Sequence, residues 1–237
     1  MSFLNPDIDA GFDIAGAAAV FQTHGHVRLA GVLPPARAET LAQTVDTLGD
    51  WVLAYGASQG VGRVAPQDIP AWPEDTRKAF NQTLIDSARR GEGFAYFARP
   101  LDAAAGDLPA PLAELRSGVM EPAVLDLVAR LTGVSGVTGV DTSATQFRPG
   151  HYLTRHTDSP RGQGRRLAFV WGLTRNWHPD WGGLLQFYQP DGTPNLAFTP
   201  GFNTLDLFSV DKVHAVTYVA PFAGAPRSAV SGWYLGG

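Results

Sequence analysis

The feature that most constrains the fold is a change of texture near residue 135. Beyond this point, short apolar runs alternate with breaks rich in proline, glycine and asparagine, which is typical of strands joined by turns. So many short strands within about 100 residues indicate a sandwich, a jelly roll or a small barrel. The predicted strands lie near residues 138–148, 151–158, 166–173, 183–189, 204–209, 213–219 and 228–235.

The first 135 residues, in contrast, are predicted to be mainly helical. Together the two parts predict a mainly β fold with an N-terminal helical layer, an α+β arrangement. Because no long linker is visible, we expect one domain over residues 1–237, with 1–135 as the supporting layer and 136–237 as the β core that carries the site. Helices are predicted over residues 36–54, 73–90 and 110–131, the last interrupted near Pro122, and a strand over 26–32.

Composition narrows the possible chemistry. The chain has no cysteine, which excludes disulfide scaffolds, thiolate-bound zinc and iron–sulfur clusters and leaves His, Asp and Glu as metal ligands. A net charge of −4 argues against a nucleic-acid partner. The N-terminus lacks the pattern of a secretory signal, and no apolar run is long enough to span a bilayer, so a cytoplasmic protein without a membrane partner is expected.

The pair His156 and Asp158 is the first candidate for metal binding. Residues two apart on a strand project from the same face, and this pair ends a strand-like run. With six histidines and 22 acidic residues, roughly 0.6 chance His-x-acid matches are expected, so context must decide. A second match, His178 and Asp180, spans a proline in a loop, where Asp180 is predicted to be a turn residue.

His214 and Arg227 lie on later strand-like segments. Taken alone, His214 has the alternative of an ordinary core histidine, and Arg227 that of a strand-end arginine. Two imidazoles and one carboxylate are, however, the ligand set of non-haem Fe(II) oxygenases, and an arginine pairs bidentately with the carboxylate of a dicarboxylate co-substrate. His24 and His26 have no carboxylate at suitable spacing and are predicted to be surface or strand-end histidines.

Several ordered motifs of the C-terminal half resemble Fe(II)/2-oxoglutarate dioxygenases, and more narrowly their prolyl hydroxylase branch. The ending Arg227-Ser-Ala-Val-Ser-Gly-Trp233 is similar to that of hydroxylases acting on prolines of ribosomal and translation proteins. The other motifs are Phe147-Arg-Pro-Gly, His156-Thr-Asp158, the run from Gly164 to Trp177, Gly182-Gly-Leu-Leu-Gln-Phe-Tyr188, Asn203-Thr-Leu-Asp-Leu-Phe208 and Val213-His-Ala-Val216.

This resemblance implies a double-stranded β-helix, a jelly-roll and cupin-like fold. It implies that His156, Asp158 and His214 hold Fe(II), that 2-oxoglutarate chelates the metal and reaches Arg227, and that O2 is the oxidant. Ascorbate is expected as a supporting reductant.

The chain departs from the family at the 2-oxoglutarate site. The family often has a tyrosine where this chain has Phe147 and another near the position of Gly172. It often has a serine where this chain has Ala229. Replacement polar contacts are expected from Tyr152, Thr154, Trp171 or Gln146.

The predicted function is hydroxylation of a prolyl residue in a protein or peptide. Two alternatives stay open at this point. One is a 2-oxoglutarate oxygenase of a free amino acid or another small metabolite, and the other is a non-catalytic jelly-roll module that binds only a metal or a ligand.

Overall fold

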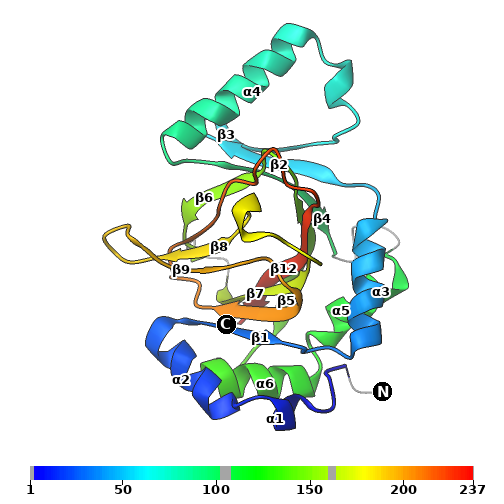
Figure 1. The fold of residues 1–237 in the computed structure, drawn as a ribbon, viewed down its shortest axis with the longest axis vertical. Helices are drawn as coiled ribbons and strands as arrows, with labels where there is room; N and C mark the ends of the chain where they lie inside the picture. Colours follow the sequence, from blue (N-terminus) through cyan, green and yellow to red (C-terminus); the bar gives the residue numbers. More distant parts are fainter. Residues whose placement is uncertain (1–2, 102–107, 160–163, 237) are drawn as a thin grey trace.

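The computed structural model describes residues 3–101, 108–159 and 164–236, and its centre is a curled antiparallel sheet with helices on its outer side (Figure 1). The strands are β1 (His26–Ala30), β2 (Val52–Ala57), β3 (Gly60–Val64), β4 (Phe94–Pro100), β5 (Gly139–Phe147), β6 (Tyr152–His156), β7 (Arg165–Leu173), β8 (Leu185–Tyr188), β9 (Pro194–Phe198), β10 (Phe202–Phe208), β11 (His214–Val216) and β12 (Arg227–Leu235).

The helices flank this sheet on two sides. They are α1 (Ile8–Gly11), α2 (Ile14–His24), α3 (Pro35–Asp46), α4 (Glu74–Arg89), α5 (Ala110–Gly118) and α6 (Pro122–Thr132), with short 3-10 turns at Ile69–Ala71 and Pro179–Trp181.

The sheet curls back on itself, because its two ends share one apolar interior. The strand order is β1-β10-β7-β12-β5-β4-β6-β11-β8-β9, and the hairpin of β2 and β3 is attached through β4. Ala168 and Val170 of β7, near one end, pack in one cluster with Leu185 and Phe187 of β8, near the other end. This closure creates the enclosed space in which the site lies.

Strand β7 is buried on both faces, which explains its nearly unbroken apolar sequence. Ala168 and Val170 face the interior of the curled sheet, whereas Leu167, Phe169 and Trp171 belong to the larger core beneath the helices. The helical layer therefore stabilises the strand from outside without entering the site.

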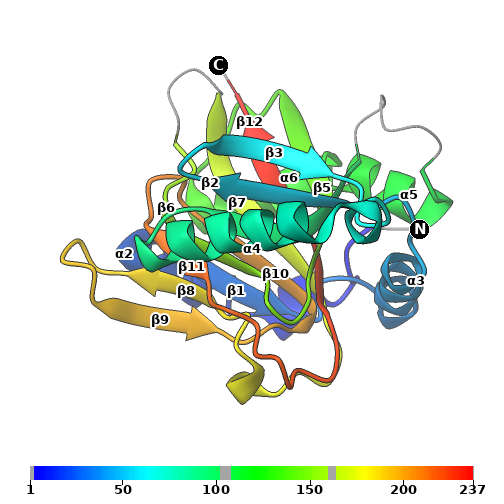
Figure 2. The same ribbon diagram turned by 90° about the horizontal axis from the view of Figure 1, so that it is seen from above.

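Helices α2, α3, α5 and α6 form the predicted supporting layer, and α4 lies apart from them at the other end of the fold (Figure 1), where it packs against β2 and β4 and lies in front of the sheet in the view of Figure 2. Helix α6 begins with Pro122 at its first turn and ends at Gly133, whose positive φ of 76° suits glycine. The predicted break of the third helix at Pro122 is thus confirmed.

The predicted division at residue 135 is wrong in one respect, because the first part also contains β2, β3 and β4. The first predicted helix was drawn to residue 54 but ends at Asp46, and Val52–Ala57 form a strand instead. This segment pairs along its length with Phe94–Ala98, a contact distant in sequence that outweighs local helical preference. The N-terminal helices α1 and α2 and strand β9 were also not predicted.

Among the described residues, no helix has the length and apolar character that crossing a bilayer requires.

Candidate metal centre

Three predicted ligands, His156, Asp158 and His214, come together at one end of the curled sheet. His156 ends β6, His214 begins β11, and the two residues face each other directly in the antiparallel pairing of these strands. Asp158 follows two residues after His156, where its backbone N–H donates to the carbonyl of Val210 at 2.8 Å. One candidate ligand atom from each side chain lies within 4.8 Å of the others.

Backbone hydrogen bonds fix the orientation of both imidazoles. Nδ1 of His156 lies 2.9 Å from the carbonyl of Thr154, and Nδ1 of His214 lies 2.9 Å from the carbonyl of Lys212. Because a carbonyl oxygen only accepts, each Nδ1–H must be the donor, which leaves each Nε2 with a free electron pair. A second ring nitrogen held in this way is the usual arrangement of a metal-binding histidine.

The electron pairs of the three groups point at one another. Nε2 of His156 lies 3.5 Å from one carboxylate oxygen of Asp158, and Nε2 of His214 lies 3.5 Å from the other. Burial, and to a smaller extent the nearby His156, lower the pKa of His214 to about 4, so His214 is neutral at pH 7. Burial opposes ionisation of Asp158, but the two histidines outweigh it and hold the Asp158 pKa below its usual range. Two imidazoles and a carboxylate arranged in this way fit a divalent cation.

Arg227 is the second charged feature of the site. It is 6% exposed, its guanidinium lies 5.0 Å from the ring centre of Phe147, and it has no ion pair or hydrogen bond among the described residues. Burial lowers its pKa to about 10, which still leaves it charged at neutral pH. A buried cation without a partner is costly, so this residue fits an anionic ligand.

A buried ion pair beside Arg227 explains how the protein tolerates this charge. Asp206 of β10 is 2% exposed, and its two oxygens accept from Nε and Nη2 of Arg28 at 2.5 and 2.7 Å. The charge of Asp206 also acts on Arg227 and opposes the effect of burial on its pKa. Asp206 is thus one carboxylate beside two arginines, Arg28 and Arg227. The net charge of these three groups is +1, which matches one carboxylate of a ligand.

The cation site and Arg227 line the same enclosed space, which we call the metal cavity. It has a volume of about 80 Å³, and Leu153, Val216 and Phe208 contribute to its apolar wall. Aromatic side chains complete the wall: Tyr96, Phe147 and Trp233.

Two of the residues expected to contact 2-oxoglutarate, Tyr152 and Thr154, lie outside the metal cavity. The Tyr152 hydroxyl donates to the carbonyl of Leu84 at 3.0 Å, and the Thr154 hydroxyl to that of Gly93 at 2.8 Å. The cause is a shift of register in which Val216 pairs with Leu153 while His214 pairs with His156. The extra residue in β6 is a bulge, and it brings Leu153 rather than Thr154 to the inner face.

The other two expected contacts, Trp171 and Gln146, also point elsewhere. Trp171 is 1% exposed and packs edge-on against Phe3 in the core beneath the helices. Gln146 alternates with the inward-facing Thr145 and Phe147, and its side chain contacts Ser228 and Arg148 on the outer side. The geometry therefore gives no support to a role for these four residues in binding the co-substrate.

The remaining histidine predictions meet mixed outcomes. His178 and Asp180 lie on a turn as predicted, and both side chains are exposed, although it is His178 Nδ1 that accepts from the Asp180 N–H. His24 is exposed, as expected. His26 begins strand β1 but is not a surface residue: it is 3% exposed and stacks on Phe187 with ring centres 4.3 Å apart.

Residues 142–235 match the family model described as the 2OG-Fe(II) oxygenase superfamily. Part of the chain is also similar to a curated protein: Prolyl 3-hydroxylase OGFOD1 of Mus musculus is 32% identical over 121 residues. The aligned residues are 47% of this chain and 22% of the mouse protein, so the chain spans about a fifth of that relative's length. Fe(II), 2-oxoglutarate and O2 are the reactants that the superfamily implies.

Solved structures agree with the predicted fold. A prolyl-4-hydroxylase of Pseudomonas putida has a TM-score of 0.62 at 16% identity, covering 94% of this chain and 99% of that one. A prolyl hydroxylase of Trichoplax adhaerens, solved with a hypoxia-inducible factor peptide fragment, has a TM-score of 0.62 at 19% identity, covering 94% and 88%. The mainly β fold of the double-stranded β-helix type, predicted from the resemblance, is confirmed.

Arg28, Asp206 and Tyr96 are the residues of the site that the sequence analysis did not identify. Asp206 carried a signal, because it is a single acidic residue within the apolar run of β10. Arg28 and Tyr96 carried none, since only the pairing of distant strands brings them to the interior.

Proposed function

We propose that this chain is an Fe(II)- and 2-oxoglutarate-dependent hydroxylase in which His156, Asp158 and His214 bind the metal. The observation that carries the proposal is the convergence of three electron-pair donors and one unpaired buried guanidinium, that of Arg227, on a single cavity. A cation and a carboxylate together satisfy all four groups. 2-Oxoglutarate meets the second requirement, because it carries a carboxylate at each end.

The chemistry comes from the bound reactants: 2-oxoglutarate is decarboxylated to succinate and CO2, and one oxygen atom is inserted into a substrate C–H bond. The residues of the chain bind, orient and exclude water. Arg227 would pair with the distal carboxylate, and Asp206 would hold the local charge at +1 so that one carboxylate neutralises it. The apolar wall around Leu153 and Val216 would keep bulk water from the metal.

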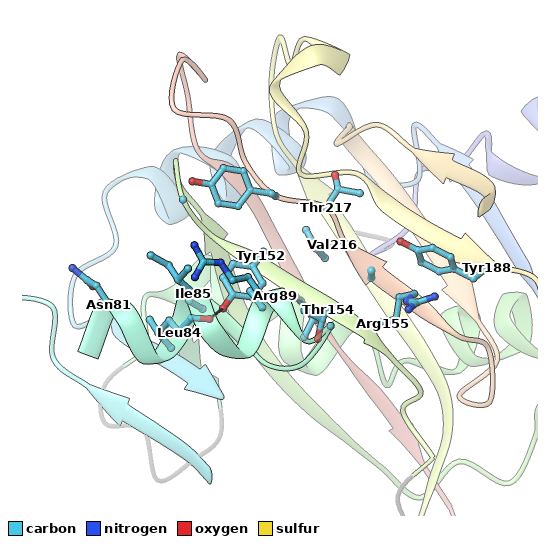
Figure 3. Close-up of a pocket in the computed structure, with 17 residues that line it drawn as sticks. Asn81, Leu84, Ile85, Arg89, Tyr152, Thr154, Arg155, Tyr188, Val216 and Thr217 are labelled. Carbon is cyan, nitrogen blue, oxygen red and sulfur yellow. Dashed lines mark hydrogen bonds between the residues drawn. The ribbon is translucent and has the colours of Figure 1, made fainter. Parts of the chain in front are cut away.

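For the substrate, we propose a prolyl residue within a protein or peptide. An open groove of about 760 Å³ lies beside the metal cavity, between α4 on one side and β6, β11 and Tyr188 on the other (Figure 3). Leu153 and Val216 line both the groove and the metal cavity, so the groove is adjacent to the proposed metal. A free amino acid needs no such groove, whereas an extended polypeptide does.

The groove surface suits the apolar ring of proline and the chain around it. Leu84 and Ile85 of α4 form one apolar side, and the exposed Tyr218 borders the groove. Two arginines, Arg89 and Arg155, also line it (Figure 3). Similarity to proteins named as prolyl hydroxylases supports this choice of substrate. Ascorbate as a supporting reductant and a cytoplasmic location remain predictions from the sequence.

The test is incubation of the Fe(II)-loaded protein with 2-oxoglutarate, O2 and proline-containing proteins, followed by mass spectrometry. We expect a product heavier by one oxygen atom on proline, with succinate formed in equal amount. Ala88→Trp, which fills the groove, should lower product formation at least about tenfold without changing the affinity for 2-oxoglutarate. Gln82→Trp, on the same helix but outside the groove, is the matched control.

Other outcomes would favour the alternatives. Succinate formation stimulated only by free amino acids, and unaffected by Ala88→Trp, would favour a small metabolite as the substrate. Metal binding without any succinate formation would favour a module that binds but does not catalyse.

A further inference from the structure

The phenol ring of Tyr96 lies in the wall of the metal cavity, on strand β4. It stacks on Phe147 with ring centres 4.7 Å apart and an angle of 15° between the planes. The other neighbour of Phe147 is the Arg227 guanidinium, 5.0 Å from its ring centre. Tyr96, Phe147 and Arg227 therefore form one continuous part of the wall, and the family match alone does not identify Tyr96.

The Tyr96 hydroxyl has no hydrogen-bond partner among the described residues, although the side chain is partly buried in the cavity wall. Burial raises the pKa of Tyr96, and the negative charge of Asp158 raises it further, so the group is a neutral O–H donor at pH 7. The influence of Asp158 also indicates that the phenol lies close to the cation site. An enclosed donor without a partner is costly, and a ligand oxygen would satisfy it.

Ser231 also lines the cavity, whereas three other positions, Phe147, Gly172 and Thr145, present no free hydroxyl to it. Phe147 has none. At Gly172, an added Cβ would lie 2.3 Å from Thr204 Oγ1 and 2.6 Å from the Gly201 carbonyl, so no larger side chain fits without rearrangement. The Thr145 hydroxyl is directed to the carbonyl of Ala229, at 3.4 Å.

We propose that Tyr96 donates a hydrogen bond to a carboxylate oxygen of bound 2-oxoglutarate and so acts as a positioning residue for the co-substrate. This assignment rests on the proposed function. In this chain the hydroxyl comes from β4, one strand away from Phe147 of β5, and reaches the cavity because the two rings are stacked in parallel.

The test is a titration of the Fe(II)-loaded protein with 2-oxoglutarate under nitrogen, followed by the charge-transfer absorbance of the metal complex. Tyr96→Phe should raise the Kd for 2-oxoglutarate about tenfold or more, as expected for a lost hydrogen bond to a charged group, with the affinity for Fe(II) unchanged. Tyr55→Phe is the matched control: Tyr55 lies opposite Ala95 on the adjoining strand β2 and packs against Phe80, away from the cavity.

A second variant separates the hydroxyl from the packing of the ring. Adding Phe147→Tyr to Tyr96→Phe places a hydroxyl on the neighbouring ring and should recover most of the lost affinity. An unchanged Kd in Tyr96→Phe, or an equal loss of affinity for Fe(II) and for 2-oxoglutarate, would overturn the assignment. A wild-type protein that binds Fe(II) but not 2-oxoglutarate would instead overturn the proposed function, and this assignment with it.

Discussion

His156 and His214 stand directly opposite each other on the paired strands β6 and β11, with ring centres 4.2 Å apart. Each Nδ1 is held by a backbone carbonyl two residues earlier in the chain, so both Nε2 atoms face the Asp158 carboxylate. The cation site is thus built by backbone pairing and does not depend on long, flexible side chains. Such a site is organised before any metal arrives.

Arg227→Ala should weaken 2-oxoglutarate binding about 100-fold or more, because it removes the partner of a buried carboxylate. The affinity of Arg227→Lys for 2-oxoglutarate should lie between those of wild type and Arg227→Ala, since an ammonium group carries the charge but cannot form the bidentate pair. Both variants should bind Fe(II) as wild type does, because Arg227 is not one of the three proposed ligands. Anaerobic titration measures both constants, and a wild-type Kd in Arg227→Ala would contradict the proposed role.

Asp206→Ala should destabilise the protein by about 3 kcal/mol or more, because it leaves the partly buried Arg28 and the buried Arg227 as neighbouring cations without a carboxylate partner. Glu39→Ala is a suitable comparison, since its ion pair with Arg175 is on the surface and should contribute much less to stability. Urea unfolding measures both changes. Equal effects of the two substitutions would show that Asp206 does not have the proposed electrostatic role.

His26 should make the metal-free protein sensitive to acid. Burial lowers its pKa from 6.5 to about 4, and its ring nitrogens have no hydrogen-bond partner among the described residues. The unfolded chain therefore binds a proton at a higher pH than the folded chain. This contribution to stability is fully present above pH 6.5 and is lost as the pH falls towards 4.

His26→Phe tests this sensitivity, because phenylalanine can keep the stacking on Phe187 without a titrating group. Between pH 7.5 and pH 5, the free energy of unfolding should decrease in both proteins, and the decrease should be about 2 kcal/mol smaller in the variant than in wild type. The exposed His24, changed to Gln, should reduce the wild-type pH dependence only in part, because its charge contributes less than burial to the lowered pKa of His26. A pH dependence in His26→Phe equal to that of wild type would exclude His26 as its source.

Two kinds of sequence information led to the candidate site. The ordered motifs identified the three candidate ligands and Arg227, and strand periodicity put His156 and Asp158 on one face. The same periodicity could not reveal the bulge in β6, because a bulge depends on how β6 pairs with β11 and leaves no mark in the side-chain pattern. Tyr152 and Thr154 were therefore expected at the co-substrate and lie in the outer groove.

The strands of the N-terminal part were missed for a related reason. Residues 52–57 continue the apolar spacing of the preceding helix, and only their pairing with β4 makes them a strand. Gly49 and Asp50, the latter with a positive φ of 55°, mark the break that the sequence did contain. Tyr96 and Asp206 reach the interior through pairings between segments far apart in the chain, which no local pattern specifies.

The most direct test of the central claim is the formation of succinate from 2-oxoglutarate by the purified protein supplied with Fe(II) and O2. We predict Fe(II)-dependent succinate formation by wild type and by the control Asp180→Ala, because the exposed pair His178 and Asp180 lies outside the cavity. In Asp158→Ala, the rate of succinate formation should fall at least about 1,000-fold. Succinate formation by Asp158→Ala at the wild-type rate, or none by folded, Fe(II)-loaded wild type, would contradict the account.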